Sequence, residues 1–168
     1  ADPSVADQTI RERYFAGKGA SQYSDGDTRG WKLPEARAKV QCDPHWMEHV
    51  SRCLHHPFDS RFIYYVPWMV DWPRQEVMPH LIRGSNRALI TTRQTRDPWC
   101  AFATDSVSTH KCMAAYDINS LFPLYLYPDP TKLDDLGDSP WPEGEEGRRP
   151  NLSKAFVDEF AGKIGLEF

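Results

Sequence analysis

Four short runs of aromatic and β-branched residues, separated by Pro and Gly, constrain the fold of this chain more than any other feature. They occupy residues 62–66, 88–92, 100–104 and 122–127. Runs of this length and composition, bounded by turn-forming residues, are typical of strands. The run 62–66 is apolar on both faces, so we expect it to be buried on both sides or nearly so.

Helices are predicted before these strands. Residues 4–7 form a capping-box pattern, which predicts a helix with Ile10 and Tyr14 on one face that stops at Gly17. Pro34 fits the first turn of a helix that runs to about Gln41. A further helix is predicted from Pro44, because the apolar residues that follow it have helical spacing. These are Trp46, Met47, Val50 and Leu54.

Two more helices are predicted later in the chain. Pro73 is expected to begin a helix in which Val77 and Leu81 point inward and which Gly84 ends. The last helix follows residues 149–153, where either Asn151 or Ser153 can cap it.

The order of these elements predicts an α+β (mixed α/β) fold with a small mixed sheet of about four strands, flanking helices and long loops. A length of 168 residues suits one domain, and we expect 1–168 to be a single domain. The opening residues Ala1-Asp2-Pro3 lack Met, which indicates a fragment of a larger polypeptide. Flexible loops are predicted at 17–30, which is rich in turn formers, and at 129–147, which is acidic.

The composition argues for a cytoplasmic protein without a membrane partner. No apolar run approaches the roughly 20 residues that a membrane span needs, and no signal-peptide pattern is present. The four cysteines form no CxxC pair, which favours reduced thiols in the cytoplasm.

No catalytic motif is recognisable. The chain has no GxSxG elbow and no glycine-rich turn after its first predicted strand, so no catalytic residue is predicted. Whether the parent polypeptide is an enzyme stays open from these residues alone. Cys42, His45 and His49 can be drawn as metal ligands, but their spacing matches no structural zinc pattern and no metal site is predicted.

Positive charge is concentrated in the middle of the chain. The net charge is −4, yet residues 61–96 hold six Arg, no Lys and two acids. The planar guanidinium matches phosphate and the guanine edge, and the amide of Gln can read adenine. We therefore predict DNA contact by residues at or near strand ends, with an ordinary solvated strand end as the alternative. The candidates are Arg93, Gln94, Arg96, Arg74 and Arg87.

Asp59 and Arg61 are interpreted differently. They lie two residues apart beside an apolar strand, which favours a structural ion pair over a binding role.

Six strings, in order along the chain, resemble one region of large restriction–modification polypeptides. They lie at 56–65, 72–78, 88–94, 102–105, 121–127 and 149–153. From about Asp2 onward the chain resembles the C-terminal specificity region of the single-chain Type ISP enzymes and the related Type IIG enzymes. In these an adenine-N6 DNA methyltransferase precedes a target-recognition region, and the same chain bears a nuclease.

The resemblance implies a DNA-recognition segment that contacts double-stranded DNA and is not itself catalytic. Its other partners are expected to be the methyltransferase and nuclease domains of the same polypeptide. S-adenosylmethionine, Mg²⁺ and ATP are implied for the parent enzyme, and no cofactor is expected in this fragment. The alternatives are a structural module that couples the methyltransferase and target-recognition domains without DNA contact, and a small independent enzyme.

Overall fold

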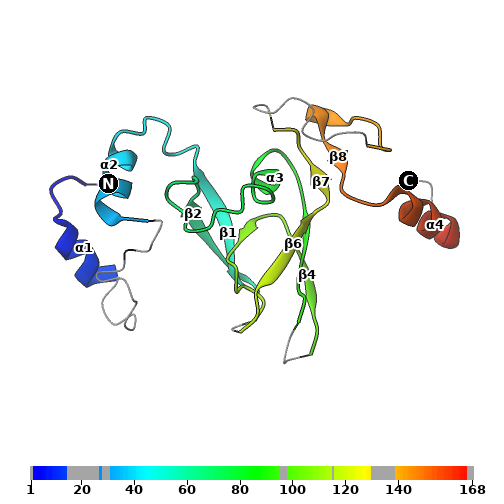
Figure 1. The fold of residues 1–168 in the computed structure, drawn as a ribbon, viewed down its shortest axis with the longest axis horizontal. Helices are drawn as coiled ribbons and strands as arrows, with labels where there is room; N and C mark the ends of the chain where they lie inside the picture. The colour runs from blue at the N-terminus through cyan, green and yellow to red at the C-terminus, as the bar shows by residue number, and fades with distance from the viewer. Residues whose placement is uncertain are drawn as a thin grey trace. The chain divides into compact units, whose positions relative to one another are not determined.

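The computed structural model describes residues 2–14, 27, 31–94, 98–114, 116–129 and 139–165. Within these ranges the chain forms four α-helices and eight short strands in sheets of two or three, which confirms the α+β class (Figure 1). The chain divides into two compact units. Unit 1 comprises Ala1–Ser51 and Phe62–Gln75, and unit 2 comprises Arg52–Arg61 and Glu76–Phe168.

Unit 1 contains helices α1 (Asp7–Tyr14) and α2 (Leu33–Gln41). The helix predicted at Pro34 is confirmed as α2, which buries Leu33 and Ala36. The capping box at 4–7 is wrong, because α1 starts only at Asp7 and the Ser4 hydroxyl donates to Asp2 at 2.7 Å instead.

The helix predicted from Pro44 is also wrong. Residues 44–49 form turns, and strand β1 (Val50–His56) follows them. The side chains with helical spacing are largely on the surface, since Trp46 is 51% and Met47 71% exposed. Pairing with a neighbouring strand outweighed the local helical pattern, which is a tertiary effect that spacing alone does not show.

Strand β1 is the middle strand of a sheet with the order β2-β1-β5. A two-residue turn, Pro57 and Phe58, leads into β2 (Asp59–Tyr64), which overlaps the strand predicted at 62–66. The expected burial of that run on both faces is wrong, since Phe62 is 77% exposed. On its other edge β1 pairs in parallel with β5 (Val107–Ser108). The tip of this hairpin, 52–61, belongs to unit 2.

A second sheet in unit 2 has the order β4-β3-β6 and is antiparallel throughout. Its strands are β3 (Ala88–Thr92), β4 (Ala101–Thr104) and β6 (Asn119–Pro123). All three were predicted, although the run 122–127 is divided between β6 and β7 (Tyr125–Leu126). Ile90, at the centre of β3, is fully buried.

The remaining elements of unit 2 are short or terminal. The helix predicted from Pro73 is reduced to α3 (Pro79–Ile82), because Trp72 and Arg74 have positive φ and Pro79 cannot donate a helical hydrogen bond. Strand β7 pairs with β8 (Arg149–Pro150).

Helix α4 (Lys154–Ile164) ends the described chain, and Ser153 is its N-cap. The Ser153 hydroxyl accepts a hydrogen bond from the amide of Phe156. Asn151 instead donates its side-chain amide to the carbonyl of Pro123 at 2.9 Å.

Most of the two predicted loops lies outside the described residues. Of 17–30 only Asp27 is described, and of 129–147 only Asp129 and 139–147, which include a 3-10 turn at Glu145–Gly147. Gly17, predicted to end the first helix, also lies outside them.

Candidate nucleic-acid interface

Strand β3 is a rigid scaffold for the side chains that follow it. It is hydrogen-bonded on both edges, with Ile90 opposite Phe102 of β4 and Leu121 of β6. Ala88, Ile90 and Thr92 are buried, while Leu89 points to the other face and is half exposed. A central strand held on two edges fixes the backbone at its ends, so the side chains there start from a defined position.

Arg93 and Gln94 come directly after β3, and both are exposed. In the described part of the chain, no hydrogen bond or ion pair engages the Arg93 guanidinium. Both side chains are therefore available to a partner. Arg96, predicted to act with them, lies outside the described residues.

Arg87 precedes β3, at the opposite end of the same strand from Arg93. At about 3.3 Å per residue the two positions are roughly 20 Å apart. The strand therefore separates these two candidates instead of joining them in one patch. A distance of this size corresponds to about six base steps of a duplex at about 3.4 Å each.

Arg74 belongs to unit 1, where it is exposed and has a φ of 49°. Arg74 already has an interaction within the structure. Arg74 therefore differs from Arg87 and Arg93, whose guanidiniums make no hydrogen bond or ion pair among the described residues.

Asn86 is a buried residue that the sequence analysis missed, and it holds the start of β3. Its amide nitrogen donates to the carbonyls of His80 at 2.7 Å and Tyr125 at 2.8 Å. Its carbonyl oxygen accepts from the amides of Arg87 at 2.8 Å and Tyr125 at 3.2 Å. Asn86 thus satisfies four backbone groups and sets the backbone position of Arg87. The only signal in the sequence is a polar residue just before an apolar run.

Asp59 and Arg61 form an ion pair in the hairpin. Arg61 donates to both carboxylate oxygens of Asp59, with Nη2 at 2.7 Å from Oδ2 and Nε at 3.1 Å from Oδ1. These hydrogen bonds lower the pKa of the Asp59 carboxyl. The Arg61 guanidinium is thus engaged within the chain, in contrast to that of Arg93.

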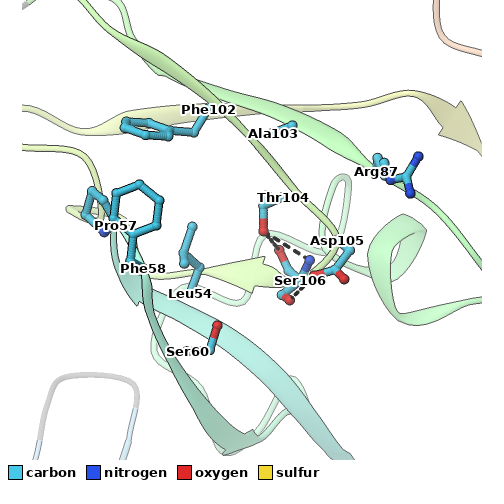
Figure 2. A pocket seen from close by; sticks show the side chains of 10 residues that line it. All are labelled: Leu54, Pro57, Phe58, Ser60, Arg87, Phe102, Ala103, Thr104, Asp105 and Ser106. Atoms are coloured by element: carbon cyan, nitrogen blue, oxygen red, sulfur yellow. Dashed lines mark hydrogen bonds between the residues drawn. The ribbon is translucent and has the colours of Figure 1, made fainter.

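An open hollow of about 340 Å³ lies in unit 2 beside the hairpin turn (Figure 2). Phe58, at the turn, is 91% exposed and meets Phe102 of β4 edge to face, with ring centroids 5.7 Å apart. The other lining residues come from the hairpin, the start of β3 and the end of β4. They are Leu54, Pro57, Ser60, Arg87, Ala103, Thr104, Asp105 and Ser106. The sequence analysis did not single out Phe58.

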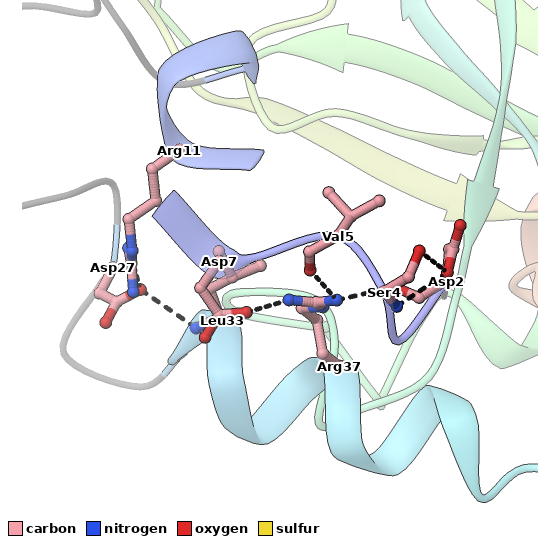
Figure 3. Close-up of polar contacts among 8 residues, drawn as sticks. All are labelled: Asp2, Ser4, Val5, Asp7, Arg11, Asp27, Leu33 and Arg37. Carbon is pink, nitrogen blue, oxygen red and sulfur yellow. Dashed lines mark hydrogen bonds and ion pairs between the residues drawn. The ribbon is translucent and has the colours of Figure 1, made fainter. Parts of the chain in front are cut away.

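Two arginines of unit 1, Arg11 and Arg37, contribute to its internal structure (Figure 3). Arg37 pairs with the carboxylate of Asp7 and donates to the carbonyls of Asp2 at 2.8 Å and Val5 at 2.6 Å. Arg11 pairs with Asp27 at 3.0 Å, which lowers the pKa of the Asp27 carboxyl. These two guanidiniums are therefore committed to internal contacts.

The described side chains offer no set of three or more His, Cys, Asp or Glu residues that would hold a metal ion. His45 lies beside Glu48, and His49 lies 3.5 Å from Asp43. Among the described helices, none has the length and apolar character that crossing a bilayer requires.

Together these features define an α+β module with exposed guanidinium, amide and aromatic groups at the ends and turns of small sheets. The family model of the Type ISP C-terminal specificity domain matches residues 4–167, and the chain belongs to this family. Specificity domains serve target recognition in restriction–modification enzymes, which gives the chain its general role. Searches of the curated proteins and of the solved structures found no match.

Proposed function

We propose that the chain is the DNA-recognition segment of a cytoplasmic restriction–modification adenine-N6 methyltransferase and contacts duplex DNA directly. The observation that carries the proposal is the exposed Arg93–Gln94 pair at the end of a central strand, in a chain of a specificity family. Methyl transfer and cleavage, with S-adenosylmethionine, Mg²⁺ and ATP, belong in this proposal to the other domains of the Type ISP parent and of its Type IIG relatives.

The two side chains have different tasks in this proposal. Arg93 contacts a phosphate or the edge of a guanine, because its planar fork fits either. Gln94 can donate to and accept from the edge of an adenine. Arg96 and Arg87 add phosphate contacts, and these position the duplex without specifying its sequence.

The first test is a fluorescence anisotropy titration of the chain with a labelled duplex of mixed sequence at several salt concentrations. Binding is expected to weaken with salt, because phosphate contacts release counterions. Arg93→Ala and Arg96→Ala are each expected to weaken binding by about 5- to 150-fold if the contact is to a base. A phosphate contact instead lowers the salt slope by about one.

Arg61→Ala is the matched control, since it removes the same charge from a side chain that is already paired with Asp59. Its affinity should equal that of the unmodified chain. If both Arg93→Ala and Arg96→Ala bind as tightly as this control, the residue assignment is wrong.

The second candidate function is a coupling module that docks the methyltransferase to the target-recognition region without touching DNA. The observation in its favour is an apolar hollow in unit 1, lined by residues that include Trp31, Leu33 and Trp46. Under this alternative the unmodified chain fails to bind duplex DNA, and Trp46→Ala abolishes pull-down by the methyltransferase domain of the parent.

A further inference from the structure

The turn of the β1–β2 hairpin carries two unfavourable features at one residue. Phe58 has a φ of 65°, a region that bulky residues other than Gly rarely adopt. Its ring is also 91% exposed. A strained backbone costs folding free energy, and an exposed ring contributes no burial energy to offset it. Strained positions cluster at functional sites. The combination makes this turn a candidate ligand site.

The hollow beside Phe58 is open to solvent and has the volume of a small binding site. Its volume of about 340 Å³ is at the lower end of the range of about 300–1,000 Å³ for small-molecule sites. Phe58 and Phe102 present aromatic surface, and Leu54 and Pro57 add apolar surface (Figure 2). Flat aromatic surface of this kind stacks well on a nucleobase.

One carboxylate at the rim of the hollow is held in place. The Ser106 hydroxyl donates to Asp105 Oδ1 at 2.6 Å, and the Ser106 amide donates to Thr104 Oγ1 at 3.1 Å. The hydrogen bond from Ser106, with smaller contributions from the charges of Arg52 and Arg87, lowers the pKa of the Asp105 carboxyl. Asp105 is therefore an ionised hydrogen-bond acceptor at neutral pH.

Arg87 supplies a cation at the same rim. Among the described residues its guanidinium makes no hydrogen bond or ion pair, although its charge acts on Asp105. Arg52 lies 3.4 Å from the other oxygen of Asp105. The hollow thus combines aromatic surface, one anionic acceptor and a guanidinium available to an anion.

We propose that this hollow binds one unpaired nucleotide of DNA, with its base stacked on Phe58, an exocyclic amino group donating to Asp105, and a phosphate contacting Arg87. A nucleotide is the occupant that carries a flat ring, an amino donor and an anion in one unit. Adenine, cytosine and guanine have such an amino group and thymine does not. An unpaired thymine can offer Asp105 only its ring N–H, so a site that recognises the amino group accepts it less well. This inference rests on the proposed DNA contact and adds a second, base-stacking site to it.

The experiment compares two labelled duplexes that differ only by one bulged adenine, titrated with the 168-residue chain. The bulged duplex is expected to bind more tightly than the paired one. Phe58→Ala should remove this preference, with a loss of about 5- to 150-fold that corresponds to one base–aromatic stack. Replacing the bulged adenine with thymine should weaken binding in the unmodified chain.

Two variants separate binding from folding. Phe62→Ala removes a ring of the same kind from the same hairpin, 77% exposed, and should retain the full preference for the bulge. Phe58→Gly relieves the positive φ, so its melting temperature should equal or exceed that of the unmodified chain while the preference is lost.

The possible results distinguish this inference from the proposed function. If neither duplex binds, the DNA contact itself fails, and this inference with it. If both duplexes bind but the bulge gives no preference, or Phe58→Ala and Phe58→Gly keep it, the nucleotide site is wrong while the duplex contact stands. Equal affinity for bulged adenine and bulged thymine would show that Asp105 does not recognise the exocyclic amino group.

Discussion

Arg37 of unit 1 and Arg87 of unit 2 use their guanidiniums in different ways. In unit 1 the guanidinium of Arg37 joins α2 to the N-terminal segment through Asp7 and two backbone carbonyls. In unit 2 the amide of Asn86 makes the comparable internal bonds, and Arg87 beside it contributes only its backbone. One arginine is part of the structure, and the other keeps its guanidinium available.

This difference shows why a count of arginines does not measure a DNA-binding surface. Residues 61–96 contain six Arg. Arg61 among them is paired with Asp59, and Arg83 donates to the carbonyl of Pro128. Charge available to DNA depends on which side chains satisfy the internal hydrogen bonds, because each guanidinium used inside the chain is withdrawn from a partner.

The largest effect is expected for Asn86→Ala. The substitution leaves four backbone groups in a largely buried site without their partner, and each unsatisfied group costs about 1–3 kcal/mol. We expect the free energy of unfolding to fall by about 3 kcal/mol or more, measured by urea denaturation. Arg87→Ala is the control and should change it by no more than about 0.5 kcal/mol. An equal loss of unfolding free energy in Asn86→Ala and Arg87→Ala would contradict the assignment of the internal hydrogen bonds to Asn86 alone.

Arg37→Ala should have the next largest effect. It removes the hydrogen bonds that hold residues 2–7 against α2, and such bonds from a charged group contribute about 1.5–3 kcal/mol. We expect a loss of about 2 kcal/mol. Hydrogen exchange in α1 should become faster, and Arg37→Lys should recover part of the protection. Unchanged hydrogen exchange in α1 would show that the Arg37 guanidinium does not hold the N-terminal residues against α2.

A pH titration should distinguish the Tyr64–Asp43 hydrogen bond of unit 1, which titrates, from the hydrogen bonds of the Asn86 amide in unit 2. In unit 1 the Tyr64 hydroxyl donates to Asp43, and burial together with this bond raises the pKa of Tyr64 to about 12. Because the folded pKa lies above the usual value of about 10, this contribution to stability is complete below about pH 10. It is lost as the pH rises through about 12. The amide of Asn86 does not titrate in this range.

Ultraviolet absorbance can follow this ionisation. Tyr64 should ionise late, at a pH of about 12, and Tyr64→Phe should abolish that phase. The late phase should also move to lower pH in Asp43→Asn, which removes the carboxylate charge. A late phase that persists in Tyr64→Phe would assign it to another residue.

The smallest effect is expected for Arg61→Ala. Its partner Asp59 is exposed to solvent in part, and ion pairs at the surface contribute little to stability. The midpoint of urea denaturation should therefore not change measurably. A shift as large as that of Arg37→Ala would mean that exposed and buried arginine pairs are equivalent here.

The short strands were the most predictable part of the fold. Three runs of β-branched and aromatic residues became β3, β4 and β6 because their local preference agrees with their pairing. The helix predicted from Pro44 failed although its apolar residues have helical spacing, because residues 50–56 pair with neighbouring strands as β1. Once β5 pairs with Cys53 and Leu54, the strand is favoured, and no local signal contains that pairing.

The candidate site was predictable in part. The position of Arg93 and Gln94 after a strand followed from the sequence, and so did their polar character. The roles of Asn86 and Phe58 could not be predicted from the sequence. Asn86 acts through four backbone partners, and Phe58 is distinguished by its positive φ.

By itself the sequence determined the α+β class, the strands β3, β4 and β6, and the family, since these depend on residue order and local preference. Only the tertiary structure decided which arginines are used internally and which remain open, as Arg37 and Arg87 illustrate. The physical reason is that hydrogen-bond partners are distant in sequence. Arg37 finds Asp2 across 35 positions, and Asn86 finds Tyr125 across 39.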